Sequence, residues 1–251
     1  MKADNFHLDT YLSRIDYEGE TANDLATLTK LMQKQLRSIP FENTLVQAGR
    51  IPSMVPEDIV DKILYRRRGG YCYEVNGIFS MALTAIGFEW YFAGARPMTY
   101  PTRRPKTHMV LIVRVEGREY LSDTGFGGYA LRAPMEIVEG EVVQEGDRFR
   151  LERVEGEYVL SALVQDVWQR LYGFASVPQE WIEFSLANYF NATHPDTIFT
   201  QKKLAIMQTP RGRKILVDNE LKLIEEGVLE KSEVDYARAL KEHFGLELLS
   251  V

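Results

Sequence analysis

Residues 108–123 read HMVLIVRVEGREYLSD, and this stretch decides how the second half of the chain folds. Its apolar residues and Glu116-Gly117, which suits a tight two-residue turn, predict a β-hairpin. With that turn Val110 lies opposite Asp123, so Asp123 becomes a diagonal neighbour of His108 on one face of the sheet. A four-residue loop gives the same register, whereas a three-residue loop would place His108 and Asp123 on opposite faces.

Short strands of the same kind surround this hairpin. From Glu89 onward the hydrophobic period is two, and turns that contain glycine separate the apolar runs. The predicted strands are residues 90–95, 108–115, 119–122, 142–143, 149–153 and 158–164. Strands of this length and spacing indicate an antiparallel sheet or barrel.

The chain has helical periodicity before Glu89 and a mixed pattern after the strands. Helices are predicted at residues 8–15, 25–39, 56–69 and 72–87. After the strands we expect a helix near 178–190, strands around 199–207 and 215–217, and a last helix with Ser232 as its cap, Asp235 three residues on and Gly245 after its end. The order is therefore helices, strands and then a mixed segment.

Composition limits the possible classes of function. Of the 251 residues, 45% are hydrophobic and 26% are charged, which is typical of a globular protein. No apolar run approaches the length of a membrane span, and residues 1–5 lack the apolar stretch of a secretory signal, so we expect a cytoplasmic protein without a membrane partner. A net charge of −6 argues against a nucleic-acid surface. One cysteine and four scattered histidines give no zinc-ligand spacing, so no metal is expected.

The single cysteine, Cys72, is the candidate nucleophile. Gly69 and Gly70 permit a sharp turn before it, and the apolar period after it begins a helix. A thiol at a helix N-terminus meets unpaired backbone N–H groups and the positive end of the helix dipole, which favour the thiolate. The alternative is a buried, inert cysteine, which is the common case for a lone cysteine.

His108 and Asp123 supply the groups that a cysteine nucleophile needs. An aspartate that accepts a hydrogen bond from one imidazole nitrogen leaves the other nitrogen free to take the thiol proton. Taken separately, His108 is a histidine at a strand end and Asp123 is a turn residue before Gly125. Their occurrence together with Cys72 at a helix start predicts a Cys-His-Asp triad.

Five stretches of the chain resemble the arylamine N-acetyltransferases. They are YLSRI at 11–15, IPFEN at 39–43, RGGYCYE at 68–74 with Asn76 after it, THM at 107–109 and DTGFG at 123–127. The resemblance implies an α+β fold with an N-terminal helical bundle at 1–88 that carries Cys72, a central antiparallel β-barrel at 89–190 that carries His108 and Asp123, and a C-terminal α/β lid at 191–251.

The resemblance also implies a reaction and its binding residues. Acetyl-CoA would acetylate Cys72, CoA would leave, and an arylamine or hydrazine nitrogen would then take the acetyl group in a ping-pong cycle. The matching substrate-binding residues are Phe41, Phe126 and Phe199, and those that let CoA approach the backbone are Thr107, Gly125, Gly127 and Gly128. Arg14 and Glu42 match a structural ion pair. Basic residues in 103–106 and 211–214 are candidates for the CoA phosphates, although a solvated charged turn explains each loop more simply.

Several alternatives remain open at this point. The same triad could perform O-acetylation of N-hydroxyarylamines, amide synthesis with another acyl donor, or hydrolysis, as in papain-like proteases. The fold could also be a binding module without activity, in which case Cys72 would react no faster than a free thiol. The sequence does not indicate the physiological acceptor or the oligomeric state.

Overall fold

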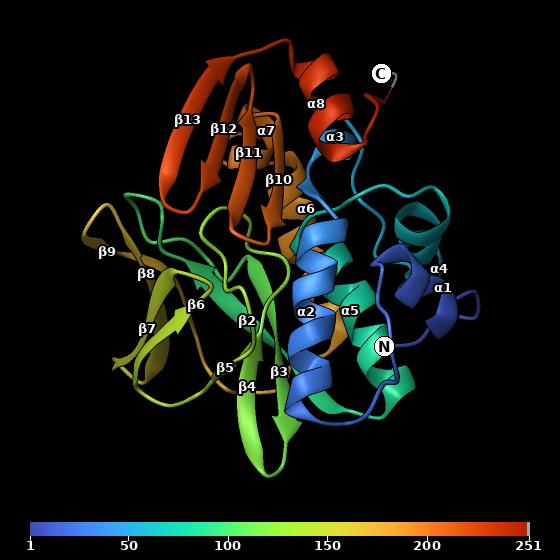
Figure 1. The fold of residues 1–251 in the computed structure, drawn as a ribbon, viewed down its shortest axis with the longest axis vertical. Helices are drawn as coiled ribbons and strands as arrows, with labels where there is room; N and C mark the ends of the chain where they lie inside the picture. The colour runs from blue at the N-terminus through green and yellow to red at the C-terminus, as the bar shows by residue number, and fades with distance from the viewer. Residues whose placement is uncertain (250–251) are drawn as a thin grey trace.

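The computed structural model describes residues 1–249, and the N-terminal part of the chain is helical (Figure 1). The elements are α1 (Leu8–Arg14), α2 (Leu25–Ser38), α3 (Thr44–Gln47), α4 (Pro56–Val60), the π-helix η1 (Asp61–Tyr65) and α5 (Cys72–Ile86). Asp24 caps α2 by accepting from the Thr27 amide. Helix α5 ends at Gly87, whose φ of 97° is a left-handed conformation that suits glycine.

Eight antiparallel strands form a nearly closed barrel beside α5 (Figure 1). They are β2 (Glu89–Pro97), β3 (His108–Val115), β4 (Arg118–Ser122), β5 (Met135–Glu136), β6 (Gly140–Gln144), β7 (Asp147–Val154), β8 (Glu157–Val164) and β9 (Val167–Phe174). Their order is β5-β4-β3-β2-β9-β8-β7-β6. Glu116 and Gly117, which join β3 to β4, both have positive φ, and Val115 pairs with Arg118. The hairpin therefore has the two-residue turn and the register that the sequence predicts.

The C-terminal part combines a sheet with helices. Its elements are the 3₁₀ helix η2 (Trp181–Glu183), α6 (Phe184–Thr193), α7 (Ile198–Gln201), β10 (Leu204–Thr209), β11 (Gly212–Val217), β12 (Glu220–Glu225), β13 (Val228–Glu233) and α8 (Tyr236–Phe244). The five-stranded sheet has the order β1-β10-β11-β12-β13, and β1 (Phe41–Glu42) comes from the helical part. Phe41 pairs with Ile206, so the two ends of the chain share one sheet.

Several elements have other bounds than the sequence predicted, and some strands were not predicted at all. The helix that opens at Pro56 ends at Tyr65 rather than at Gly69, because Arg67 has a φ of 52°. Residues 198–201 form α7, not the start of a strand. Ser232 lies in β13 instead of capping the last helix. Strands β5, β9, β12 and β13 were not predicted, and the division at 88 and 190 stays a prediction.

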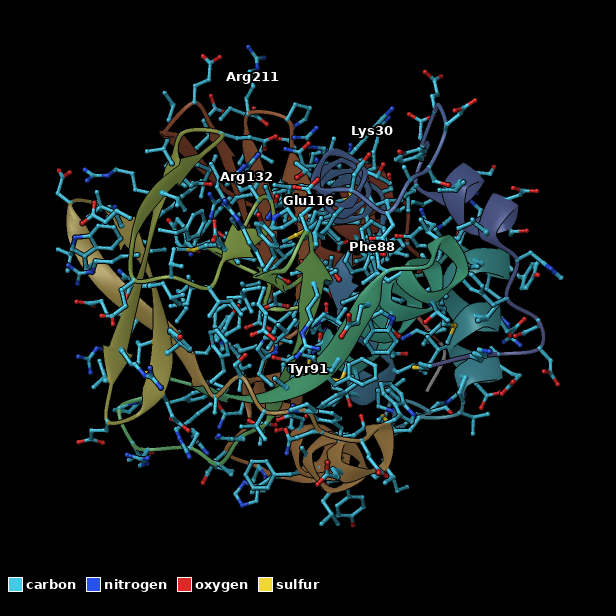
Figure 2. The ribbon with its side chains drawn as sticks, turned by 90° about the horizontal axis from the view of Figure 1, so that it is seen from below. Lys30, Phe88, Tyr91, Glu116, Arg132 and Arg211 are labelled. Carbon is cyan, nitrogen blue, oxygen red and sulfur yellow. The ribbon has the colours of Figure 1, made fainter. Side chains whose placement is uncertain are left out.

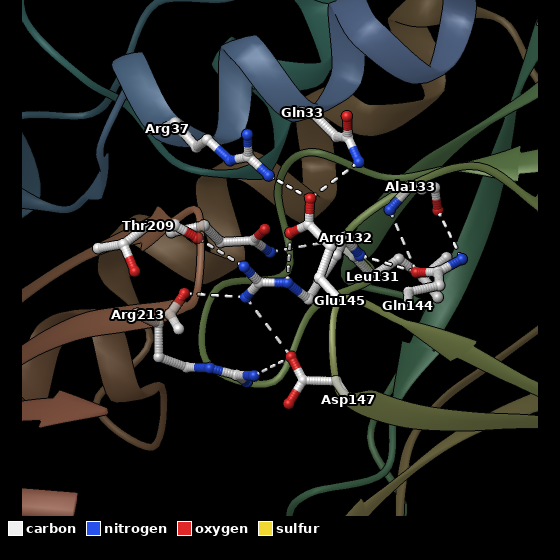
Figure 3. Close-up of polar contacts among 12 residues, drawn as sticks. Gln33, Arg37, Leu131, Arg132, Ala133, Gln144, Glu145, Asp147, Thr209 and Arg213 are labelled. Carbon is white, nitrogen blue, oxygen red and sulfur yellow. Dashed lines mark hydrogen bonds and ion pairs between the residues drawn. The ribbon is translucent and has the colours of Figure 1, made fainter. Parts of the chain in front are cut away.

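A cluster of charged residues around the buried Arg132 joins the three parts (Figure 3). Arg132 is fully buried; its Nε donates to Glu145 over 2.8 Å, and its Nη1 donates to the Gly212 carbonyl over 2.8 Å. Glu145 also accepts from Arg37 on α2. Figure 2 shows Arg132 inside the molecule, whereas Arg211 projects outward from the turn between β10 and β11. The cluster therefore ties α2, the barrel and the C-terminal sheet together.

The described residues also bear on membranes and metals. None of the helices within residues 1–249 is long and apolar enough to cross a membrane. In the same range, no group of three or more His, Cys, Asp or Glu side chains is placed to hold a metal ion.

Candidate active site

Cys72 is the first residue of α5 and only 2% of its surface is exposed. The Tyr71 amide donates to the Glu74 carboxylate over 3.2 Å, which fixes the start of the helix. A Cβ on Gly70 would lie 2.7 Å from Glu74, and a Cβ on Gly125 would lie 2.7 Å from Cα of Cys72. Gly70 therefore permits the turn before Cys72, and Gly125 lets the loop after β4 pass directly against the backbone of this cysteine.

His108 and Asp123 form a buried pair at the adjoining ends of β3 and β4. Nε2 of His108 lies 2.7 Å from Oδ2 of Asp123, and Oδ1 of Asp123 accepts from Asn76 Nδ2 at 3.0 Å and from the Gly125 amide at 2.8 Å. Burial raises the pKa of Asp123, but the charge and hydrogen bond of His108, together with the other donors, lower it below its usual value. Asp123 is therefore ionised at neutral pH and fixes the orientation of the imidazole.

The surroundings of Cys72 favour the protonated thiol, whereas the sequence predicted a thiolate. Burial raises the pKa of the thiol and the charge of Asp123 raises it further, while the backbone donors of Met109 and Tyr73 lower it. The helix N-terminus does not produce a thiolate by itself, because desolvation of the anion outweighs the backbone donors. A thiolate here needs a neighbouring cation, and the imidazole of His108, which lines the same cavity as Cys72, can supply one.

Cys72 and His108 line one cavity of about 380 Å³. Seven other predicted site residues line the same cavity: Phe41, Phe126, Phe199, Thr107, Gly125, Gly127 and Gly128. Asp123 is 1% exposed and lies behind His108 instead of facing the cavity. The structure thus brings all the predicted site residues together, although their roles stay predictions.

Sequence reasoning missed Tyr172 on β9. Its ring is fully buried, with its centroid 5.0 Å from that of His108 and 4.9 Å from that of Phe126. Burial and then the charge of Asp123 raise the pKa of the Tyr172 hydroxyl, which has no well-aligned hydrogen-bond partner within residues 1–249. The ring of Tyr172 therefore packs against the imidazole of His108. Because β9 itself was not predicted, nothing in the sequence pattern pointed to this residue.

A polar network behind the site was also missed. Thr124 stands where many members of the resembled family have an aliphatic residue, and its hydroxyl lies 2.8 Å from both Gln35 Nε2 and Asn76 Oδ1. Gln35 Nε2 also donates to the Val75 carbonyl at 2.9 Å. The network links α2 and α5 to the segment that carries Asp123, and it holds the Asn76 amide so that Nδ2 faces that carboxylate.

The expected ion pair between Arg14 and Glu42 is wrong. Arg14 donates to the backbone carbonyls of Ile63 and Ser38 at 3.1 and 2.6 Å, and within residues 1–249 it has no carboxylate at ion-pair distance. Glu42 is instead 3.5 Å from Lys62 Nζ. Arg14 sits at the C-terminal end of α2, where unpaired carbonyls attract a guanidinium before any side chain does.

Neither predicted basic loop lines the cavity. Residues 103–106 lie beside its mouth, because Arg104 stacks on the ring of Tyr100, which is a lining residue, at 4.4 Å. Lys106 is paired with Glu157 at 2.8 Å. In the other loop, Arg213 is buried and paired with Asp147. Arg213 also lies over the ring of Tyr129, another lining residue, at 4.5 Å, so both loops border the cavity.

The fold and the site define an α+β protein with a cysteine beside a buried His-Asp pair, and its class is that of the N-acetyltransferases: the family model described as N-acetyltransferase matches residues 24–250. Human arylamine N-acetyltransferase 1 is 30% identical, with 96% of this chain and 94% of the relative covered. The arylamine N-acetyltransferase of Mycobacterium tuberculosis (strain ATCC 25618 / H37Rv) is 33% identical, with 97% and 90% covered.

Solved structures agree with these relatives. The Mycobacterium marinum arylamine N-acetyltransferase in complex with CoA matches with a TM-score of 0.89 and 32% identity, over 95% of this chain and 92% of that one. The Salmonella typhimurium arylamine N-acetyltransferase matches with a TM-score of 0.91 and 28% identity, over 95% and 90%. This chain belongs to the arylamine N-acetyltransferase family.

Proposed function

We propose that this enzyme transfers an acetyl group from acetyl-CoA to the nitrogen of an arylamine or hydrazine through a thioester on Cys72. One observation carries the proposal: Cys72 and His108 face the same cavity of about 380 Å³, and the buried Asp123 holds His108 from behind. The relatives named for acetylation of arylamines, and the CoA that one of them binds, support the same donor and acceptor.

The first half of the cycle acetylates Cys72. Asp123 accepts from Nε2 of His108, so Nδ1 takes the proton of the thiol. The imidazolium between the thiolate and Asp123 offsets the raised pKa of the buried thiol. The thiolate attacks the carbonyl carbon of acetyl-CoA, and as the intermediate collapses the CoA sulfur leaves with the proton from His108.

The second half transfers the acetyl group to the acceptor. The neutral amine nitrogen attacks the Cys72 thioester, His108 takes a proton from that nitrogen, and the bond between carbon and sulfur breaks. Cys72 recovers the proton from His108, and the acetylated amine leaves. Phe41, Phe126 and Phe199 form aromatic walls against which the ring of an arylamine packs.

The donor enters beside the loop of residues 125–128. Thr107, Gly125, Gly127 and Gly128 line the cavity, and a Cβ on Gly128 would meet no atom within 4 Å, so the backbone at Gly128 is open to a ligand. Acetyl-CoA is a substrate of the cycle, and no metal takes part in it.

The test is intact-protein mass after brief incubation with acetyl-CoA, for the parent and for Cys72→Ala. A single acetyl adduct on the parent, absent from the variant and lost when an arylamine is added with formation of the acetylated amine, supports the cycle. An adduct that water removes as fast as the amine does would favour the hydrolase. No adduct from acetyl-CoA, but one from another acyl thioester, would favour amide synthesis with that donor.

A further inference from the structure

A second cavity, of about 460 Å³, lies away from Cys72 and shares no lining residue with the first cavity. Five arginines line it, and we call it the arginine pocket: Arg14, Arg37, Arg66, Arg67 and Arg68. Its lining residues come mainly from the C-terminal end of α2, the segment after η1 and the end of α8. Met207, Phe244 and Leu246 form an apolar side.

The charges of this pocket are only partly balanced. Arg66 pairs with Asp61 at 2.6 Å, and Arg37 pairs with Glu145. In contrast, no carboxylate within residues 1–249 lies at ion-pair distance from Arg14, Arg67 or Arg68. The remaining lining carboxylate, Glu247, is paired with Lys241 at 2.8 Å. Arg68 donates to Thr44 Oγ1 at 3.1 Å and to the Glu247 carbonyl at 2.9 Å, and its charge lowers the pKa of Glu42 and of Glu247. The described part of the chain therefore leaves Arg14 and Arg67 as the two cations of the pocket without a carboxylate partner.

Helix capping explains Arg14 but not its neighbours. Arg14 satisfies the carbonyl of Ser38 at the end of α2, yet burial and the charge of Arg67 lower its pKa to about 10, so the two cations repel each other. The Nε of Arg68 is buried without a hydrogen-bond partner in the described residues. Arg67 is exposed at the cavity and makes no hydrogen bond with its side chain there. An anion would relieve the repulsion and satisfy these donors.

The backbone holds the three consecutive arginines in place. Arg66 follows the π-helix η1 as its C-cap and its amide donates to Asp61 O at 2.9 Å, while the Arg68 amide donates to Lys62 O at 3.0 Å. Arg67 between them has a φ of 52°, which is uncommon for a residue other than glycine. π-Helical turns and strained residues occur often at ligand sites, where they aim side chains.

We propose that the arginine pocket binds a phosphate-bearing anion. Guanidinium groups form paired hydrogen bonds with phosphate oxygens, and a cavity lined by five arginines matches an anion with two or more charges. Inorganic pyrophosphate is a suitable probe, because it carries several charges and fits within the cavity. The site is independent of the proposed acetyl transfer, since it lies outside the cavity of Cys72.

Occupancy stabilises the segment that leads to Cys72. Arg68 is followed by Gly69 and Gly70, and a Cβ on Gly69 would lie 2.1 Å from the Pro40 carbonyl, so this segment packs directly against the backbone of Pro40. An anion that fixes Arg67 and Arg68 therefore holds the turn before α5 without touching the reacting atoms. We therefore expect pyrophosphate to raise the unfolding temperature of the protein.

The test is a calorimetric titration of the full chain with pyrophosphate, in the presence of saturating CoA and at constant ionic strength. CoA blocks the Cys72 cavity, so the heat of pyrophosphate binding that remains comes from the arginine pocket. Arg67→Asn removes the charge and keeps a residue that tolerates positive φ, and we expect about tenfold weaker binding. Arg211→Asn, at an exposed arginine elsewhere, is the matched control and should bind as the parent does.

Three outcomes would overturn the proposal. Pyrophosphate heat that disappears with CoA would place the anion in the Cys72 cavity. Equal affinity of Arg67→Asn and Arg211→Asn would mean that Arg67 does not contact the anion. No saturable binding to the parent would mean that the arginines serve only to cap helices and hold the loop. Because the readout is binding, it does not depend on acetyl transfer.

Discussion

The carboxylate of Asp123 has three hydrogen-bond donors, and each comes from a different segment of the chain. His108 begins β3, Asn76 lies on α5, and Gly125 follows in the next loop. These donors keep Asp123 ionised although it is fully buried. The position of the imidazole therefore depends on contacts that only the folded chain supplies.

Replacing Asp123 tests this dependence. In Asp123→Asn the amide no longer supplies a negative charge to Nε2 of His108, so the imidazole loses its preferred tautomer. We expect acetylation of Cys72 to slow by about 10³- to 10⁴-fold, measured by rapid-quench mass spectrometry. Asp166→Asn, at an exposed position, is the control. A loss below tenfold would contradict the role proposed for Asp123.

The same carboxylate makes stability depend on pH. Its pKa is lower in the folded state than in the unfolded chain, where it is about 3.9. Unfolding in acid therefore takes up a proton at Asp123, and the stability that Asp123 contributes is present above about pH 3.9 and is lost as the pH falls through the folded pKa. We expect urea unfolding free energies to fall less steeply with acid in Asp123→Asn than in the parent. Equal slopes would contradict this linkage.

Thr124 offers a test of the network behind the site. In Thr124→Val the buried donor Gln35 Nε2 loses one partner and Asn76 Oδ1 loses another, so we expect a destabilisation of about 1–3 kcal/mol. Thr124→Ser keeps the hydroxyl and should cost less. Urea unfolding measures both, and a cost of Thr124→Val no larger than that of Thr124→Ser would contradict the role of the hydroxyl in the network.

At the scale of elements, α5 and the loop after β4 meet through Gly125. A side chain there would lie 2.7 Å from Cα of Cys72, which is backbone and cannot move aside. Gly125→Ala should therefore separate Cys72 from His108 and slow acetylation of Cys72 by more than about tenfold. Gly87→Asn, at the other end of α5 with open space around it, should have no such effect. Equal rates for both variants would contradict the close contact.

The sequence predicted elements well where local signals and tertiary contacts agree. The turn at Glu116-Gly117 sets the register of β3 and β4, so the meeting of His108 with Asp123 could be deduced. Ser232 resembled a helix cap, but pairing with Leu221 keeps it in a strand. Asp235 caps α8 instead, accepting from the Arg238 amide at 2.8 Å. Strands β12 and β13 pair with their neighbours along the chain through two-residue turns, but every residue of β13 is exposed, so no apolar alternation marked it as a strand.

At the scale of the whole molecule, the cluster around Arg132 is the strongest link between the parts. In Arg132→Met, Glu145 and Asp147 lose a cation and two backbone carbonyls lose a donor, so we expect a destabilisation of about 3 kcal/mol. Arg148→Met, which removes an exposed pair with Glu141, should cost less than about 1 kcal/mol. Equal costs in urea unfolding would mean that the buried cluster contributes no more than a surface pair.

The overall arrangement was predictable only in part. Helices followed by strands follow from hydrophobic periodicity, but the raised pKa of the Cys72 thiol depends on burial, which periodicity does not measure. The position of Arg14 at helix ends, rather than beside Glu42, likewise depends on how α1 and α2 meet. Such features come from contacts between distant segments, and a single sequence does not encode them locally.

The pairing of Phe41 with Ile206 affects the order in which parts of the protein fold during synthesis. During translation α5 and the barrel can form while the last quarter of the chain is still in the ribosome, because their contacts are closer in sequence. Strand β1 has no partner at that stage, and Phe41 cannot complete its wall of the cavity. A nascent chain that lacks β10 therefore carries Cys72 without a closed site around it, and the wall of the cavity at Phe41 is completed only when β10 pairs with β1.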